Sequence, residues 1–127
     1  MTGEASSNLK DAQEKCKKMS AMLPIIKSDS ANNFILTLER HWVWLGMERK
    51  NGRMVWFDNT PAEPSEGALY DAWNNNEPSK DGNCAYLDFN NRKWNDDKCD
   101  RGGRASPNVL CQKIRYLKND LSSKMDE

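Results

Sequence analysis

The residues best suited to chemistry are oxygen-bearing side chains gathered in the second half of the sequence. Residues 66–100 contain eight acidic and four basic side chains. Within this stretch, Glu77-Pro78-Ser79 and Trp94-Asn95-Asp96 supply carboxylate, hydroxyl and amide oxygens. Ca²⁺ is a hard cation that takes about six to eight such oxygens. The stretch therefore indicates a cation site, although its charge alone fits a solvated loop surface equally well.

Covalent catalysis is not indicated by the sequence. A Ser-His-Asp or Cys-His arrangement would have to use His41, the single histidine, which follows a helical pattern and precedes an aromatic strand pattern. The sequence has no phosphate-binding glycine loop, dinucleotide-binding glycine motif or His-Glu-x-x-His zinc motif. Adjacent acids such as Asp96 and Asp97 suit glycosidase chemistry in principle, but on a loop they are more often metal ligands or plain solvated charges. We therefore predict a binding protein rather than an enzyme.

The cysteines point to an oxidising compartment. Four cysteines stand at positions 16, 84, 99 and 111, with no Cys-x-x-Cys pair. An even count with one histidine favours two disulfides over a zinc finger. Arithmetic alone leaves three pairings open. The sequence thus predicts a secreted protein or the extracellular portion of a larger one.

Overall charge and hydropathy exclude two further classes of protein. The 19 basic and 19 acidic residues give a net charge of zero, which argues against nucleic-acid binding through a positive field. A membrane span requires about 18 consecutive apolar residues. No apolar run in this sequence approaches that length. We therefore expect neither a nucleic-acid partner nor a membrane span.

The chain of 127 residues fits one domain, and its elements must hold the oxygen-bearing segments. Apolar residues at steps of three and four predict two helices. Ser6 or Ser7 would cap the first helix, and Asp29 or Ser30 the second. The apolar face of the second helix would be formed by Phe34, Ile35 and Leu38. An Asn51-Gly52 pair predicts a hairpin. The long aperiodic stretch 58–83 is typical of a functional loop. The predicted helices cover residues 6–21 and 29–39. The predicted strands cover 23–26, 42–46, 54–57, 84–89 and 109–114, and a further strand begins at residue 93.

The order of several motifs resembles the C-type lectin-like domain family. The spacing is specific, with seven residues from Glu77 to Cys84 and ten from Cys84 to Trp94. The matching segments are Trp42-Val43-Trp44-Leu45-Gly46, Trp56-Phe57-Asp58, Trp73 with Asn76-Glu77-Pro78-Ser79, Cys84, Trp94-Asn95-Asp96, Cys99 and Leu110-Cys111.

The resemblance covers about residues 8–114 and implies a fold for the chain. This fold is the α+β C-type lectin fold, with two helices, two small antiparallel sheets, a long calcium-binding loop and two disulfides. The implied disulfide pairing is Cys16–Cys111 and Cys84–Cys99. The predicted domain covers 1–118, and a polar tail follows over 119–127.

The resemblance also implies the site. One Ca²⁺ would be held at the junction of the Glu-Pro-Ser loop and the Trp-Asn-Asp strand, and Pro78 would follow a cis peptide. Sugar hydroxyls would complete the coordination and would contact the same residues. Asp81 is a further candidate ligand. The implied metal and sugar ligands are Glu77, Ser79, Asn95 and Asp96.

A second Glu-Pro-Ser triplet and three departures qualify this site. Glu63-Pro64-Ser65 repeats the triplet, but Glu63 lies fourteen residues before Glu77, too early for the family's spacing. Ser79 replaces the amide or acid of the family's common triplets. Gly82 and Lys80 stand where members often carry acids. A second calcium site is therefore not expected.

The implied function is calcium-dependent carbohydrate binding without catalysis. Galactose-type sugars are slightly preferred over mannose-type sugars, because the amide that mannose-type members carry at position 79 is absent. The first alternative is a calcium-independent protein-interaction module on the same fold. The second is an ice-binding surface, for which the sequence lacks a regular threonine array.

The ends of the chain raise a question of assembly. Members of the family usually begin with a strand that pairs with the last one, but only residues 1–5 precede the first predicted helix. An uncovered strand edge invites pairing with another chain. We therefore expect either a homo-oligomer formed through 109–117 or cover from the C-terminal tail.

Overall fold

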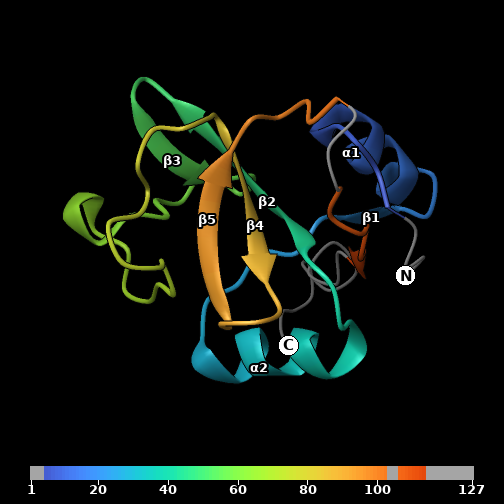
Figure 1. The fold of residues 1–127 in the computed structure, drawn as a ribbon, viewed down its shortest axis with the longest axis horizontal. Helices are drawn as coiled ribbons and strands as arrows, with labels where there is room; N and C mark the ends of the chain where they lie inside the picture. The colour runs from blue at the N-terminus through green and yellow to red at the C-terminus, as the bar shows by residue number, and fades with distance from the viewer. Residues whose placement is uncertain (1–4, 103–105, 114–127) are drawn as a thin grey trace, which may run out of the picture.

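A computed structural model describes residues 5–102 and 106–113. Its main sheet is antiparallel, with strand order β3-β2-β4-β5, and a small second sheet pairs β1 with β6 (Figure 1). The two helices and two small antiparallel sheets confirm the predicted α+β fold. The elements are α1 (Leu9–Lys17), β1 (Ala21–Met22), α2 (Asp29–Leu38), β2 (Val43–Lys50), β3 (Arg53–Trp56), the short 3₁₀ helix η1 (Pro64–Glu66), β4 (Cys84–Asp88), β5 (Lys93–Asp97) and β6 (Gln112–Lys113).

The first helix is shorter than its apolar pattern predicts. It begins after Asn8, whose side chain accepts a hydrogen bond from the Asp11 N–H at 2.8 Å, so the predicted caps at Ser6 and Ser7 are wrong. It ends at Lys17, and Ser20 takes a positive φ of 55° soon after. A left-handed residue cannot continue a helix. The apolar steps beyond Lys17 therefore belong to a turn and not to helix.

The second helix is placed close to its prediction, but its buried face is different. Ser28 caps it by accepting from the Ala31 N–H at 3.1 Å, so the predicted caps at Asp29 and Ser30 are wrong. Asn32 and Ile35 are buried, whereas Phe34 is 61% exposed. Burial of the polar Asn32 requires hydrogen-bond partners, which it finds across the core. Because Asn32 faces inward, the helix is rotated, and the predicted roles of Phe34 and Leu38 in the buried face are wrong.

The Asn51-Gly52 hairpin is confirmed, with both residues at positive φ between β2 and β3. The predicted strand over 23–26 is wrong, because the strand lies earlier, at β1. Pro24 has no N–H to donate, and its carbonyl instead accepts from the Gly46 N–H at 2.8 Å. Of the last predicted strand, the structure has Gln112–Lys113 as β6, and residue 114 lies outside the described part.

Both predicted disulfides are present. Cys16 of α1 bonds to Cys111, 95 residues away, and Cys84 of β4 bonds to Cys99 beyond β5. The described segment before α1 forms two isolated bridges, from Ala5 to Asn108 and from Asn8 to Asp100. On one side β6 pairs with β1. The predicted tail over 119–127 and the boundary at 118 lie outside the described residues, so the expected association stays a prediction.

Candidate functional site

The end of the long loop is aligned along β5 by backbone pairing and aromatic contacts. The Trp94 N–H donates to the Ala72 carbonyl at 2.8 Å, and the Asn74 N–H donates to the Trp94 carbonyl at 3.0 Å. The rings of Trp73 and Trp94 meet edge to face, with centroids 5.5 Å apart. The long loop lies on the opposite side of the main sheet from α1 (Figure 1). Because of these contacts, the loop segment after Asn74 lies beside the β5 residues that follow Trp94.

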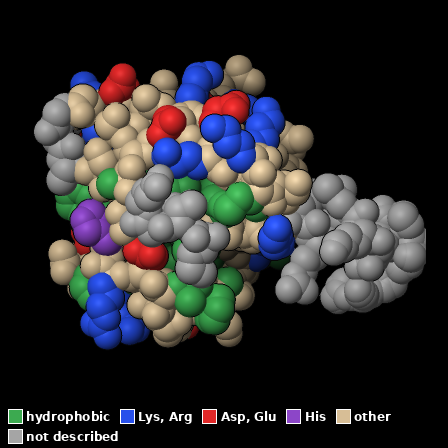
Figure 2. All heavy atoms as spheres, turned by 90° about the vertical axis from the view of Figure 1, so that its right-hand side faces the viewer, with side chains coloured by type: hydrophobic (Ala, Val, Ile, Leu, Met, Phe, Trp, Pro, Cys, Tyr) green, Lys and Arg blue, Asp and Glu red, His purple; other side chains and the backbone are tan. Residues whose placement is uncertain are grey.

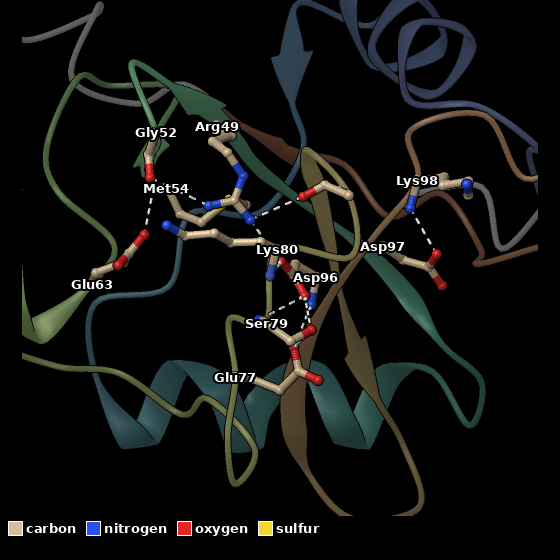
Figure 3. Close-up of polar contacts among 11 residues, drawn as sticks. Arg49, Gly52, Met54, Glu63, Glu77, Ser79, Lys80, Asp96, Asp97 and Lys98 are labelled. Carbon is tan, nitrogen blue, oxygen red and sulfur yellow. Dashed lines mark hydrogen bonds and ion pairs between the residues drawn. The ribbon is translucent and has the colours of Figure 1, made fainter.

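Three of the predicted site residues, Glu77, Ser79 and Asp96, meet there (Figure 3). The Glu77–Pro78 peptide is cis, as the resemblance implies. The Ser79 hydroxyl lies 3.2 Å from Glu77 Oε1 and 3.0 Å from Asp96 Oδ1. Glu77 Oε1 also accepts from the Asp96 N–H at 3.3 Å. The loop and the strand are therefore joined by the oxygen-bearing side chains themselves.

Asp96 is the most enclosed group of this cluster, and its side chain has no exposed surface. Its Oδ1 accepts from the Ser79 N–H at 3.1 Å and from the Ser79 hydroxyl. Its Oδ2 accepts from the Lys80 N–H at 2.7 Å and from Arg49 Nη2 at 2.6 Å. A buried carboxylate is stable only when it is paired and hydrogen-bonded. Arg49 supplies the charge and the loop backbone supplies the remaining bonds.

The two carboxyl groups have opposite pKa shifts. Burial raises the pKa of Glu77, and its hydrogen bond with Asp96 raises it further. Burial also acts to raise the pKa of Asp96, but hydrogen bonds from Glu77, Ser79 and Lys80 outweigh it and hold the pKa below its usual value. Asp96 therefore keeps the negative charge, and Glu77 is the carboxyl that takes up a proton more readily.

The donor set fits a calcium ion in kind and spacing. Carboxylate oxygens of Glu77, Asp81 and Asp96 all lie within 4.8 Å of one another, and the Ser79 hydroxyl lies between two of them. Oxygens on opposite sides of a Ca²⁺ ion are separated by about 5 Å, because each bond is about 2.4 Å long. The loop thus brings Asp81 to the cluster.

Gly82 cannot supply the acid that family members often carry at its position. A Cβ atom there would lie 2.0 Å from the carbonyl carbon of Asp97, which leaves no room for a side chain. The Gly82 carbonyl accepts from Arg49 Nη2 at 3.0 Å instead. An arginine therefore reaches the place where the resemblance implies an acid.

Asn95 is the predicted ligand that does not join the cluster through any contact in the described part of the chain. Its amide oxygen accepts from the Asn74 side chain at 3.3 Å. Successive side chains of a strand point to opposite faces, and Asp96 faces inward. Asn95 consequently lies beside the loop segment at Asn74.

Sequence reasoning missed Arg49. It stands in Glu48-Arg49-Lys50 before the Asn-Gly turn, which is typical of a solvated hairpin end. The one signal available was Gly82, at the position two residues before Cys84 where family members often carry an acid. The reading of Glu63 as ordinary loop sequence agrees with its contacts, because its carboxylate accepts from the Met54 N–H at 2.7 Å, in the hairpin.

The single histidine takes no part in this site. His41 is exposed (Figure 2) and stacks edge to face on the neighbouring Trp42 ring. The same face carries basic and acidic side chains interspersed, in keeping with the net charge of zero (Figure 2). The position agrees with a surface role for this residue.

Comparison with known proteins places the chain in a family. The model of the family described as "Lectin C-type domain" matches residues 5–113, and the chain belongs to this family. Human CD209 antigen is 33% identical over 97 residues, which cover 72% of this chain and 23% of that protein. The mouse scavenger receptor C-type lectin carbohydrate-recognition domain has a TM-score of 0.71 at 24% identity, covering 90% of this chain and 86% of that one.

A structure described as a calcium-independent type II antifreeze protein is also similar, with a TM-score of 0.70 at 21% identity and coverage of 87% of this chain and 81% of that one. The chain therefore spans less than a quarter of the human relative but most of each solved domain. Domains of this family are binding modules, so this chain is a binding domain and not an enzyme. None of the described helices is long and apolar enough to cross a membrane.

Proposed function

We propose that this domain binds carbohydrate through one calcium ion held by Glu77, Ser79 and Asp96, with Asp81 and Asn95 as further ligands. The observation that carries the proposal is the meeting of three carboxylate oxygens within 4.8 Å of one another, next to a serine hydroxyl. When bound, the ion would offer coordination positions to vicinal sugar hydroxyls. The exposed position of Ser79 and the partial exposure of Glu77 leave these ligands within reach of a sugar.

The chain's own residues would orient the sugar. The Glu77 carboxylate would accept from sugar hydroxyls, and the Asn95 amide would donate to them. Because Ser79 lacks the amide of mannose-type members, galactose-type sugars remain the slight preference. The site lies on a loop held by Trp73 and Trp94, so the ligands are presented from a rigid base.

A glycan array probed in calcium and again in a chelator tests this function. We expect binding to galactose- or mannose-type glycans that disappears in the chelator, and its loss in Glu77→Ala. Arrays without any glycan signal would contradict carbohydrate binding. Signals that survive the chelator would contradict the calcium requirement alone.

One observation favours the second candidate, a calcium-independent binding module. The charge of the buried Asp96 is already paired with Arg49 at 2.6 Å, so the loop is held without an ion. For this candidate, a thermal-shift titration would give the same melting temperature with calcium and with a chelator.

We also propose an extracellular location for the domain, as the two disulfides favour. Association with a second copy through 109–117, or cover of the same edge by the C-terminal tail, remains our proposal for this part of the chain. Analytical ultracentrifugation of the full chain and of a chain ending at residue 113 would test it. A monomer in both cases would contradict association.

A further inference from the structure

Arg49 lies in β2 of the main sheet, and its side chain contacts the site from the buried side. Its backbone N–H donates to the Asn83 carbonyl at 2.8 Å, which fixes β2 beside the loop. Its Nη2 lies 2.6 Å from Asp96 Oδ2 and 3.0 Å from the Gly82 carbonyl oxygen (Figure 3). Its side chain is only 11% exposed. This burial and double contact distinguish it from an ordinary surface arginine.

The Asp96 carboxylate has its hydrogen-bonding capacity filled. It accepts four hydrogen bonds, two on each oxygen, and an ionised carboxylate offers about four lone-pair sites. A metal ion can bind Asp96 only when at least one donor leaves. Arg49 is the one cationic donor to Asp96 among the described residues. A bound metal ion would neutralise the same carboxylate charge, so Arg49 is the donor that the ion would replace.

We infer that Arg49 is a built-in counter-cation that competes with Ca²⁺ for Asp96 and so sets the calcium affinity of this domain. The inference rests on the proposed function. Arg49 keeps the loop joined to β5 in the absence of the ion, and Ca²⁺ binds after the guanidinium has moved from Asp96 Oδ2. The loop and β5 therefore stay joined at low calcium concentration, and the affinity of the domain for calcium is low.

The charge of the cluster gives the direction of the effect. Three carboxylates and one guanidinium meet at this place. Calcium affinity rises with the negative charge of the ligand set. Removal of the guanidinium leaves that charge uncompensated and the Asp96 oxygen open. At Gly82 no side chain fits, so an acid that would outcompete the arginine cannot stand there.

The test is a calcium titration of the full chain by isothermal calorimetry. Arg49→Met removes the charge and keeps an apolar stem, and Arg49→Gln keeps hydrogen-bond donors for Asp96. Arg53→Met is the matched control, because Arg53 lies in the same hairpin and pairs with Glu66 with a 58% exposed side chain. We expect both Arg49 variants to bind calcium at least tenfold more tightly than the parent, and Arg53→Met to match the parent.

Thermal unfolding of the same proteins gives a second readout. In a chelator the Arg49 variants should melt below the parent, and calcium should raise their melting temperatures by more than it raises that of the parent. Arg49→Gln tests the inference even if Arg49→Met does not fold. Calcium binding by the Arg49 variants that is equal to or weaker than that of the parent would overturn the inference.

The failure of the inference is distinct from that of the proposed function. Calorimetry and melting involve no sugar. An empty glycan array alongside tighter calcium binding in the Arg49 variants would overturn carbohydrate binding and support the inference.

Discussion

The indole N–H of Trp94 in β5 donates to the amide oxygen of Asn32 in α2 at 2.9 Å, and both side chains are buried. The Asn32 amide group in turn donates to the Arg92 carbonyl at 3.2 Å. One polar side chain thus joins a helix to the strand that bears Asp96. Since buried polar groups without partners are costly, this bond orients α2 against the main sheet.

Asn32→Ala should lower the free energy of unfolding by about 2 kcal/mol, because it leaves the indole N–H of Trp94 buried without its partner. Urea denaturation followed by tryptophan fluorescence measures this change. Asn33→Ala is the control, since the Asn33 side chain bonds only to exposed Asp29 in the described structure. The control should change stability by less than about 0.5 kcal/mol. Equal effects of the two variants would contradict the role of Asn32.

Variants in the two Glu-Pro-Ser triplets should have different effects: one should lower stability and the other should remove binding. Glu63→Ala removes the acceptor of the Met54 N–H and should cost about 1 kcal/mol of stability without loss of calcium or sugar binding. Glu77→Ala should abolish binding, because it removes a carboxylate from the cluster. Calorimetry and the glycan array, together with urea denaturation, distinguish the two. Loss of binding in Glu63→Ala would show that the wrong triplet has been assigned.

Asp96 and Asp81 should differ in what they support. The sequence alone predicts that Asp96→Ala abolishes calcium and sugar binding and leaves the fold intact. Its burial and its bond to Arg49 lead us to expect, in addition, a loss of about 3 kcal/mol in stability, because the buried guanidinium loses its one carboxylate partner among the described residues. Asp81→Ala, at an exposed position, should weaken calcium binding and change stability by less than about 0.5 kcal/mol. Unchanged binding in Asp96→Ala would rule out the lectin site.

Acidic pH should destabilise the contact between the turn after β3 and the chain before α2, where Lys27 pairs with Asp58. Burial acts to raise the pKa of Asp58, but hydrogen bonds from Thr60 and Lys27 outweigh it and lower the pKa. A lowered folded-state pKa contributes stability above the unfolded value, and this stability is lost as the pH falls below about 4. Melting temperatures between about pH 6 and pH 3 should therefore fall more steeply for the parent than for Asp58→Asn. Parallel curves would contradict this prediction.

Motif order and spacing in the sequence were sufficient for the resemblance to the family; that resemblance implied the disulfide pairing, which the structure has, and the preference for Glu77 over Glu63, which stays a prediction. These features depend on residue types at set distances along the chain, which a sequence displays directly. The Asn51-Gly52 turn was predictable for the same reason, because its conformation depends on its own two residues. The presence of both helices also followed from local apolar steps.

Only the tertiary structure decided which groups meet. Arg49 and Asp96 are 47 residues apart, and their contact depends on β4 lying between β2 and β5. The burial of Asn32 and the exposure of Phe34 depend likewise on partners across the core. Local periodicity reports a helix's own geometry and not what packs against it. The charge that pairs with Asp96 was therefore decided by the register of the sheet and the path of the loop, which no local pattern encodes.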